Sequence, residues 1–389
     1  MKVENKPTIA LTGATGFLGS HLMASLISDG YRIIVLGRSN KKETLQERIN
    51  KLLKWFGIEN LSGKLELIEI DLLKPMMGLP ETEYKNLCTA TDQIIHCASD
   101  TSFAERKRDI VFRSNVASLD GILEFASDSR VDFFHYISTA YVTGGTGNAC
   151  KECLSYTTDF INVYEESKAA AEKKIDKFCR DKSIPFTLIR PSIVYGDSHT
   201  GRSLKFNALY FPVQSANYIR EIYLNDLKEN EGKKSKEFGI HIDNEGYLFL
   251  PLKIYLTGKG ALNLIPVDYF VNATMRIISN ASSGGIYHLT NNTFSNLETL
   301  SKYNEKLMRM KGVEIVYEKP KEDVSCNPAE ALFNRFIEPY RPYLSDIRLF
   351  DRENTDLATN NLQPPEFNFD IFKVCMEYAI SVKWGESIF

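Results

Sequence analysis

Residues 8–39 read TIALTGATGFLGSHLMASLISDGYRIIVLGRS, and this stretch decides the fold of the chain. Thr8–Thr12 is a short apolar run with β-branched residues, which predicts a buried strand. From Phe17 onward apolar residues recur at helical spacing, and Asp29-Gly30 ends this helix. Tyr31–Gly37 predicts a second strand. The order strand, glycine turn, helix and strand is the unit that binds dinucleotides.

Three glycines lie between the first strand and the helix, with the spacing GxxGxxG. Gly13 allows a tight turn, Gly16 lets the backbone approach a pyrophosphate, and Gly19 lets the helix pack closely on the sheet. The helix N-terminus then faces the negative charge of the phosphates. The spacing is one residue longer than GxGxxG, but its place between a strand and a helix predicts nucleotide binding.

The end of the second strand indicates which dinucleotide is bound. An acidic residue there would hold a ribose 2′-hydroxyl, whereas this chain has Arg38, with Arg48 downstream. Arginine suits a 2′-phosphate because its guanidinium forms paired hydrogen bonds, so we expect NADPH. The alternative is that Arg38 belongs to a solvated loop without a ligand. A third strand ends at Asp71, next to Leu72, where a carboxylate could reach the adenine edge.

Two further strands lead to the same edge of the predicted sheet. The strand from Asp92 ends in the small residues Ala98 and Ser99, which fits a strand tip crossed by a cofactor. The strand within residues 131–142 ends at Ser138-Thr139. Ligands of such sheets lie outside the carboxyl ends of the strands, so Thr139 arrives beside the glycine turn.

A helix is predicted within residues 162–173, NVYEESKAAAEK. It places Tyr164 and Lys168 on one face, a turn apart. A chance pair on a solvated face would explain this spacing equally well in isolation. Because the helix follows the strand that carries Thr139, its first turn can face the same crevice, and we expect these three side chains to meet there.

The composition limits the class of protein. The chain has 389 residues, of which 43% are hydrophobic and 25% charged, and its net charge is -3, which does not favour a nucleic-acid partner. The sequence suggests no transmembrane segment, and the start MKVENKPTIALTG suggests no signal peptide. Seven cysteines, an odd number, suggest reduced thiols and a cytoplasmic protein. Cys150 and Cys153 form an unaccompanied CxxC, so we expect no metal site.

Beyond residue 200 the alternation of strands and helices stops. We expect an α/β fold, a Rossmann-type doubly wound parallel sheet with a smaller, mostly helical substrate-binding lobe. The NADP-binding domain would take residues 1–200, completed by about 261–292, and the lobe 201–260 and 293–389. Aromatic residues are frequent within 204–260, where they form either plain core or a wall for a long apolar substrate.

Several segments, in chain order, resemble the extended short-chain dehydrogenase/reductase family: TGATGFLG, HCAS, SNV, YISTAYV, YEESK and RPSIVYGD. The resemblance spans most of residues 8–292. Within this family the chain is similar to thioester reductase domains and fatty acyl-CoA reductases, through TGATGFLGSHL, ERINKLL and FINVYEESKAAAE.

The resemblance implies that Tyr164 is the general acid, Lys168 its partner, and Thr139 the hydroxyl that holds the substrate oxygen. A lysine ammonium stabilises a nearby phenolate, and preorganised donors stabilise an oxygen that gains charge. Asn115 would support the active-site helix or a proton-relay water. The expected cofactor contacts are Gly13, Thr15, Gly16, Phe17, Leu18, Gly19, Arg38, Arg48, Asp71, Leu72, Ala98, Ser99, Asn115, Tyr164, Lys168, Pro191, Ser192 and Ile193.

The sequence therefore leads to NADPH-dependent reduction of an acyl thioester to the aldehyde, with onward reduction to the alcohol left open. Since the dinucleotide fold starts within the first dozen residues, we expect the thioester on coenzyme A or a separate acyl carrier protein. One alternative is another oxidoreductase or epimerase of the extended family, acting on a sterol-like, ketone or sugar-nucleotide substrate. The other is a non-catalytic nucleotide-sensing protein, against which Thr139, Tyr164 and Lys168 argue. Acyl length, carrier type and oligomeric state stay open.

Overall fold

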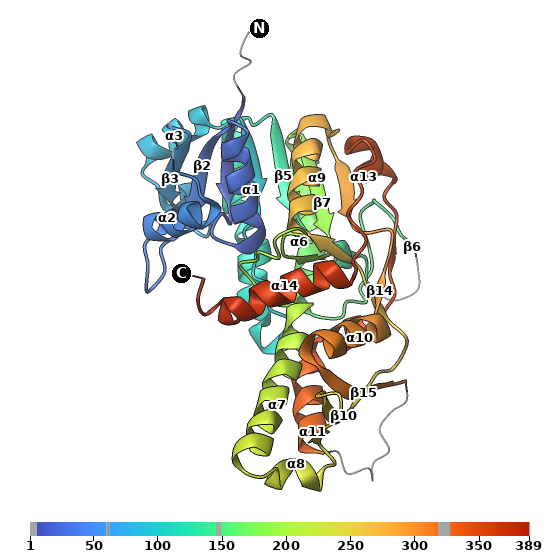
Figure 1. Cartoon of the computed structure of the whole chain (residues 1–389). Coiled ribbons are helices and arrows are strands. Elements are labelled where there is room, and N and C mark those ends of the chain that lie inside the picture. Colours follow the sequence, from blue (N-terminus) through green and yellow to red (C-terminus); the bar gives the residue numbers. More distant parts are fainter. Residues whose placement is uncertain (1–5, 60, 62, 145–148, 318–326, 389) are drawn as a thin grey trace.

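A computed structural model describes residues 6–59, 61, 63–144, 149–317 and 327–388 (Figure 1). Seven parallel strands form the main sheet in the order β13-β7-β5-β4-β1-β2-β3. Their bounds are Thr8–Thr12 (β1), Arg32–Gly37 (β2), Leu65–Glu69 (β3), Gln93–His96 (β4), Phe133–Ile137 (β5), Phe186–Pro191 (β7) and Gly285–Leu289 (β13). The strand order reverses beside β1, which is where ligands bind in doubly wound sheets.

Helices cover both faces of this sheet because its strands are apolar on both sides. One core cluster joins the sheet to α1 (Phe17–Ser28), α2 (Leu45–Phe56) and α9 (Val267–Asn280). A second cluster joins the other face to α3 (Glu81–Ala90), α5 (Leu119–Ser129) and α6 (Val163–Asp181). The doubly wound parallel sheet expected from the sequence is thus confirmed.

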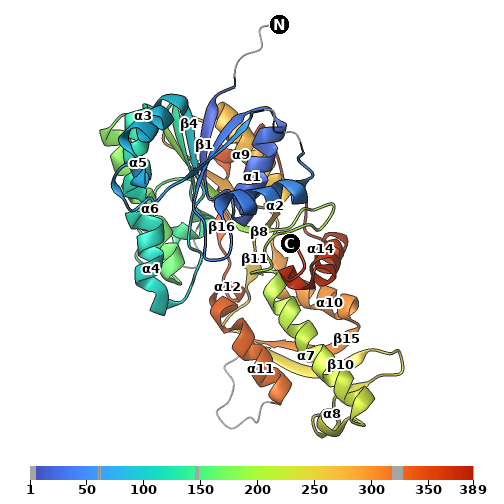
Figure 2. The same ribbon diagram turned by 90° about the vertical axis from the view of Figure 1, so that its left-hand side faces the viewer.

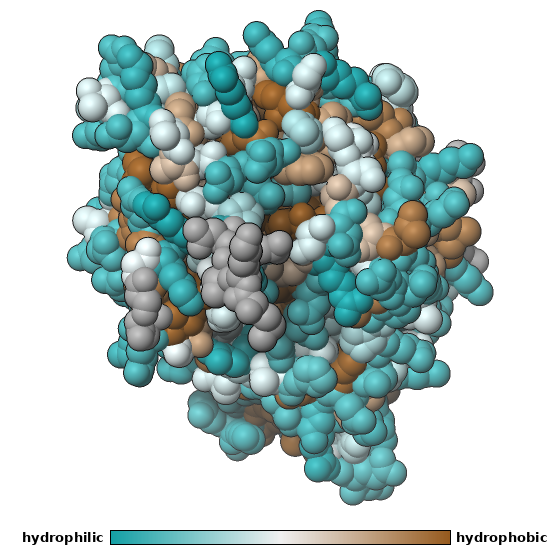
Figure 3. All heavy atoms as spheres, turned by 90° about the horizontal axis from the view of Figure 1, so that it is seen from above, coloured by the Kyte–Doolittle hydropathy of each residue, from teal (hydrophilic) through white to brown (hydrophobic). Residues whose placement is uncertain are grey.

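The direction of the strands places their carboxyl ends toward the lobe. β1 starts near the N-terminus at the top of Figure 1, and the parallel strands run down from there. The end of the sheet domain that points away from the lobe is seen from above in Figure 3, and its surface is mainly hydrophilic with scattered hydrophobic residues. The edge that binds ligands in this fold therefore meets the second part of the molecule.

The lobe occupies the lower part of Figures 1 and 2. Besides helices it contains a three-stranded sheet in the order β15-β10-β9, which the sequence did not reveal. Its strands are β9 (His241–Ile242), β10 (Leu248–Tyr255) and β15 (Met310–Val316). The lobe helices are α7 (Tyr210–Glu229), α8 (Lys233–Glu237), α10 (Leu297–Met308), α11 (Pro328–Ile337), α12 (Arg341–Leu344) and α14 (Phe369–Ser381).

The chain passes between the two parts several times. Short parallel pairs join β8 (Ile193–Tyr195) to β12 (Leu264–Pro266) and β6 (Ala149–Cys150) to β16 (Leu349–Phe350). An antiparallel pair joins β11 (Ala261–Leu262) to β14 (Ser295–Asn296). After β16, α13 (Glu353–Ala358) packs against β13 and α9 of the sheet domain. The C-terminal part of the chain therefore contacts both the sheet domain and the lobe.

Candidate active site

The glycine turn after β1 is tightly packed. Gly13 has φ +75°, and a Cβ there would lie 2.6 Å from the backbone nitrogen of Ala98. A Cβ on Gly19 would collide with the carbonyl oxygen of Gly13. Gly16 caps α1 without a side-chain hydrogen bond, so the amide groups of the first helical turn have no side-chain cap. This cradle fits the diphosphate of a dinucleotide.

Two arginines lie where β2 ends beside this turn. The guanidinium of Arg48 donates to the carbonyl oxygen of Arg38 at 3.0 Å and to Oγ1 of Thr15 at 2.7 Å. The Arg38 side chain is exposed. Arg48 thus connects the glycine turn to the strand end at which a ribose would lie in this fold.

Asn115 lies in a π-helical turn, Arg113–Ala117, and its side chain forms hydrogen bonds with Ser99, Asp100 and Ser167. Its amide nitrogen donates to the Asp100 carbonyl oxygen and to Oγ of Ser167, both at 2.9 Å. Its side-chain oxygen accepts from the Asp100 amide at 2.7 Å. Asn115 therefore ties the loop after β4 to α6, as a support for the helix that carries Tyr164.

Thr139 and Tyr164 meet at the carboxyl edge of the sheet. Thr139 follows β5, is 6% exposed, and donates to the Pro191 carbonyl oxygen at 3.5 Å. Its hydroxyl is also close enough to the Tyr164 phenol to favour the charged form of that phenol. Asn162 caps α6 by accepting from the Glu165 amide at 3.1 Å, which fixes the first turn of the helix. Burial raises the pKa of Tyr164 above its usual value, and the charges of Cys97 and Glu165 add to this rise. The phenol thus keeps its proton at neutral pH.

Lys168 lies one turn further along α6 and is 1% exposed. Its ammonium donates to the Ile137 carbonyl oxygen at 2.7 Å and lies 4.1 Å from the centre of the Tyr136 ring. Burial lowers the pKa of Lys168 to about 7, although Cys97 and Glu172 favour its charged form. Nearby His96 hydrogen-bonds Thr12 at 2.8 Å, and burial lowers its pKa to about 3, so it is a neutral core residue.

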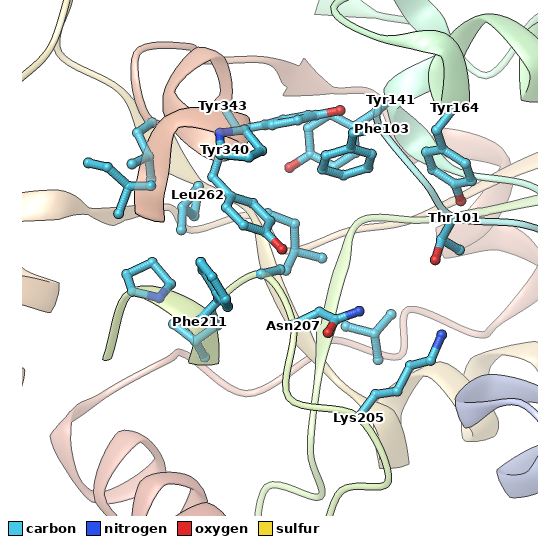
Figure 4. Close-up of a pocket in the computed structure, with 18 of the residues that line it drawn as sticks. Thr101, Phe103, Tyr141, Tyr164, Lys205, Asn207, Phe211, Leu262, Tyr340 and Tyr343 are labelled. Carbon is cyan, nitrogen blue, oxygen red and sulfur yellow. The ribbon is translucent and has the colours of Figure 1, made fainter. Parts of the chain in front are cut away.

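A cavity of about 690 Å³ opens at these residues and extends into the lobe. Figure 4 shows Phe103, Tyr141 and Tyr164 near one another and Phe211 with Tyr340 across the space, with Lys205 and Asn207 below. The aromatic rings form a connected series. The centre of the Phe103 ring lies 6.0 Å from that of Tyr164 and 5.9 Å from that of Tyr340, and the Tyr340 ring centre lies 5.5 Å from that of Phe211. The cavity therefore joins the polar edge of the sheet to an aromatic and aliphatic interior.

The predicted residues divide into two groups. Those that line the cavity are Gly13, Gly16, Phe17, Leu18, Gly19, Ser99, Thr139, Tyr164, Lys168, Pro191, Ser192 and Ile193. The others lie outside its lining: Thr15, Arg38, Arg48, Asp71, Leu72, Ala98 and Asn115. Of this second group, Asp71 accepts a hydrogen bond from the Leu73 amide at 3.1 Å. The roles expected for these residues stay predictions.

Most of the residues that line the cavity from the lobe carry no motif that could have been recognised in the sequence. Lys205, Asn207, Tyr340 and Tyr343 line the cavity from segments without a motif. Of the aromatic residues noted within 204–260, Phe211 lines the cavity, whereas Phe206, Tyr210 and Tyr223 belong to the lobe core, and the first two also interact with each other. Nothing in the sequence around Phe211 distinguishes it from the aromatic residues of the lobe core, because the difference lies in its position beside the cavity.

The described residues contain no group of three or more His, Cys, Asp or Glu that could hold a metal ion. Cys150 is buried and accepts a hydrogen bond from Thr143 at 3.0 Å, while Cys153 is exposed. No described helix has the length and apolar character that crossing a bilayer requires.

Comparison with known proteins adds to this geometry. Residues 11–274 match the NAD-binding family described as male sterility protein. The nonribosomal peptide synthetase asaC of Aspergillus flavus is 25% identical over 381 residues, which make up 90% of this chain and 33% of that protein. The hybrid synthetase pvhA of Talaromyces variabilis is 31% identical over 193 residues, 49% of this chain and 4% of that protein. The chain thus spans only a minor part of these relatives' length.

Solved structures share the fold over nearly the whole chain. The terminal R domain from the myxalamid PKS-NRPS pathway has a TM-score of 0.74 at 23% identity, covering 98% of this chain and 92% of that one. A thiolation-reductase di-domain from an archaeal non-ribosomal peptide synthetase has a TM-score of 0.70 at 16% identity, covering 97% and 76%. The chain belongs to the NAD-binding family described as male sterility protein.

Proposed function

We propose that the protein reduces an acyl thioester to the aldehyde with NADPH. The observation that carries this proposal is the continuity of one cavity, which joins Thr139, Tyr164 and Lys168 to an apolar interior in the lobe. A reactive carbonyl at the sheet edge and an apolar acyl group in the lobe would fit this arrangement. A sugar nucleotide would instead place several hydroxyl groups against aliphatic and aromatic side chains, at a cost for each unpaired group.

The cofactor would lie on the glycine turn. The cradle formed by Gly13 and Gly19 has no room for side chains, and α1 begins there without a side-chain cap. Arg38 and Arg48 at the end of β2 favour a cofactor with a 2′-phosphate. When bound, the nicotinamide nucleotide supplies the hydride. The residues of the chain then hold it, orient the thioester and stabilise the oxygen that gains charge.

Thr139 and Tyr164 are the donors for that oxygen. Both side chains line the cavity at the sheet edge, and the Thr139 hydroxyl is close enough to the Tyr164 phenol to favour its charged form, so the two hydroxyls are placed to contact one carbonyl oxygen. Tyr164 donates its proton as the oxygen gains charge, and the buried ammonium of Lys168, one turn further along α6, stabilises the resulting phenolate. The tetrahedral product of a thioester collapses to the aldehyde and expels a thiolate.

The thiol part of the substrate would come from coenzyme A or an acyl carrier protein. Two observations favour a carrier: the relatives named above are peptide and hybrid synthetases, and one solved neighbour combines a thiolation domain with a reductase. The arm would enter between the sheet domain and the lobe. Basic Arg106, Lys107 and Lys205 line the cavity and would suit the phosphate of a pantetheine arm.

The test is incubation of the purified protein with NADPH and a set of thioesters, with identification of the products. The set holds matched acyl groups on coenzyme A and on phosphopantetheinylated carrier protein, and the control replaces each thioester by its free acid. We expect aldehyde or alcohol from thioesters and no product from free acids. Reduction of ketones or conversion of sugar nucleotides, without any turnover of a thioester, would contradict the proposal.

A further inference from the structure

The first turn of α6 is held by a buried network that the reaction scheme above does not use. Glu165, next to Tyr164, is fully buried, and Tyr343 of α12 donates its hydroxyl proton to Oε1 of Glu165 at 2.8 Å. The Arg348 guanidinium lies 3.4 Å from the same oxygen. Tyr343 is 178 residues from Glu165 in the sequence, so this contact joins the C-terminal part of the chain to the active-site helix.

Arg348 contacts both segments that carry the proposed donors. Its Nη1 donates to the carbonyl oxygen of Tyr141, two residues after Thr139, at 3.1 Å. The same nitrogen reaches Glu165, one residue after Tyr164. Its Nε donates to Asp346 at 2.6 Å, and the side chain is 2% exposed. One guanidinium thus fixes the turn after β5 relative to the start of α6.

Tyr343 completes the link to the cavity. Its ring lies 5.3 Å from Tyr141 and 5.6 Å from Phe103, and Asn162, the cap of α6, donates to its hydroxyl at 2.6 Å. Figure 4 shows Tyr343 near Tyr141 and Phe103. A side chain that lines the cavity therefore also holds the helix cap.

We propose that Arg348 and Tyr343 are positioning residues, which set the distance between the Thr139 and Tyr164 hydroxyls through Tyr141 and Glu165. This inference rests on the proposed function for its kinetic readout. Buried ion pairs often contribute little to the free energy of unfolding. Stability alone therefore does not explain why the Arg348–Glu165 pair lies next to Thr139 and Tyr164 in the chain. A small displacement of reacting groups, by contrast, lowers the rate strongly.

The test compares Arg348→Lys and Tyr343→Phe with the matched control Arg352→Lys. Arg352 is 4% exposed and belongs to the same C-terminal segment, but it donates to Asp356 and to the carbonyl oxygens of Thr290 and Leu362, and it lies 6.0 Å from the centre of the Tyr269 ring. Lysine keeps the charge but has all its donors on one nitrogen, so it does not reproduce the planar fork in which Nε contacts Asp346 while Nη1 contacts Tyr141 and Glu165. Tyr343→Phe removes only the hydroxyl and keeps the ring, so the packing around it is retained. This variant therefore still tests the proposal if Arg348→Lys folds poorly.

We expect kcat on a thioester to fall about 10- to 100-fold in Arg348→Lys, with NADPH affinity unchanged. Tyr343→Phe should show a smaller fall, and Arg352→Lys should keep the parent kcat at equal folded fraction. A second readout needs no substrate and uses the NMR chemical shift of the Tyr164 13Cζ atom, whose signal is assigned by its loss in Tyr164→Phe. This chemical shift should change in Arg348→Lys and Tyr343→Phe and should stay the same in Arg352→Lys.

The turnover rate and the Tyr164 resonance together distinguish a failure of the proposed thioester reduction from a failure of the positioning role. If the parent turns over no thioester, the proposed function fails, and the Tyr164 resonance alone then decides the positioning role. Equal kcat and an equal Tyr164 resonance in Arg348→Lys and Arg352→Lys would overturn that role. The same conclusion would follow if Tyr343→Phe matched the parent in both measurements.

Discussion

The two walls of the cavity differ in chemistry. The sheet edge presents Thr139, Tyr164 and Lys168, which are buried or half-buried, and hydrogen bonds to backbone carbonyl oxygens hold Thr139 and Lys168. The lobe presents mainly aliphatic and aromatic side chains, including Phe211 and Val313. This difference suggests a division of labour, in which the sheet edge performs the reaction and the lobe selects the acyl group.

Tyr164→Phe should have the largest effect on this comparison, since it removes one hydroxyl from the polar wall. We expect turnover to fall about 10²- to 10⁴-fold, the usual contribution of a general acid. Cofactor affinity should stay within twofold of the parent, measured by fluorescence titration. Near-normal turnover in this variant would show that the sheet edge does not supply the proton through Tyr164.

Arg38→Ala tests whether the sheet edge also selects the cofactor. Removal of a hydrogen bond to a charged group costs about 1.5–3 kcal/mol, so the preference for NADPH over NADH should fall at least roughly 10-fold. Titration of both cofactors against parent and variant measures this preference. Equal affinity of the parent for NADPH and NADH would remove the basis of the prediction.

Val313→Phe tests the lobe wall. Val313 lies on β15 and lines the cavity, so a larger side chain should shorten the space for the acyl group. We expect KM for a long-chain thioester to rise about tenfold, as exclusion of two methylene groups would cause, with little change for a short-chain one. Ile222→Phe, on the exposed part of α7 outside the cavity, is the control. If both acyl lengths respond alike, the lobe does not measure chain length.

The pH dependence should show the smallest effect and concerns Lys168 alone. Burial lowers its pKa to about 7, so the ammonium is present below this pH and is lost above it, while the raised pKa of Tyr164 keeps the phenol protonated. Turnover should therefore decline a few-fold as the pH rises from about 6 to 8. The same lowered pKa makes the free energy of unfolding rise with pH between about 7 and the ordinary lysine value of 10.5, since Lys168 binds a proton in the unfolded chain but not in the folded one over this range. A flat rate profile across this range would exclude Lys168 as the titrating partner.

The sequence predicted the sheet domain much better than the lobe, for a physical reason. The glycine turn, the strand tips and the Tyr164–Lys168 spacing are local patterns, because a few consecutive residues define each of them. The pairing of β10 with β15 joins segments about sixty residues apart, and no short pattern specifies such a partner. Tyr343 and Arg348 are likewise far from Glu165 in the sequence, and only the fold brings them to it.

The most direct test of the account follows free thiol and NADPH in one reaction. Thiol is measured with a disulfide reagent on quenched samples while NADPH absorbance is recorded, using the thioester that gives the highest rate. Thioester reduction predicts that thiol appears in step with NADPH oxidation, with one NADPH per thiol for the aldehyde or two if the alcohol accumulates. NADPH oxidation with a ketone or sugar nucleotide, and no thiol from any thioester, would contradict it.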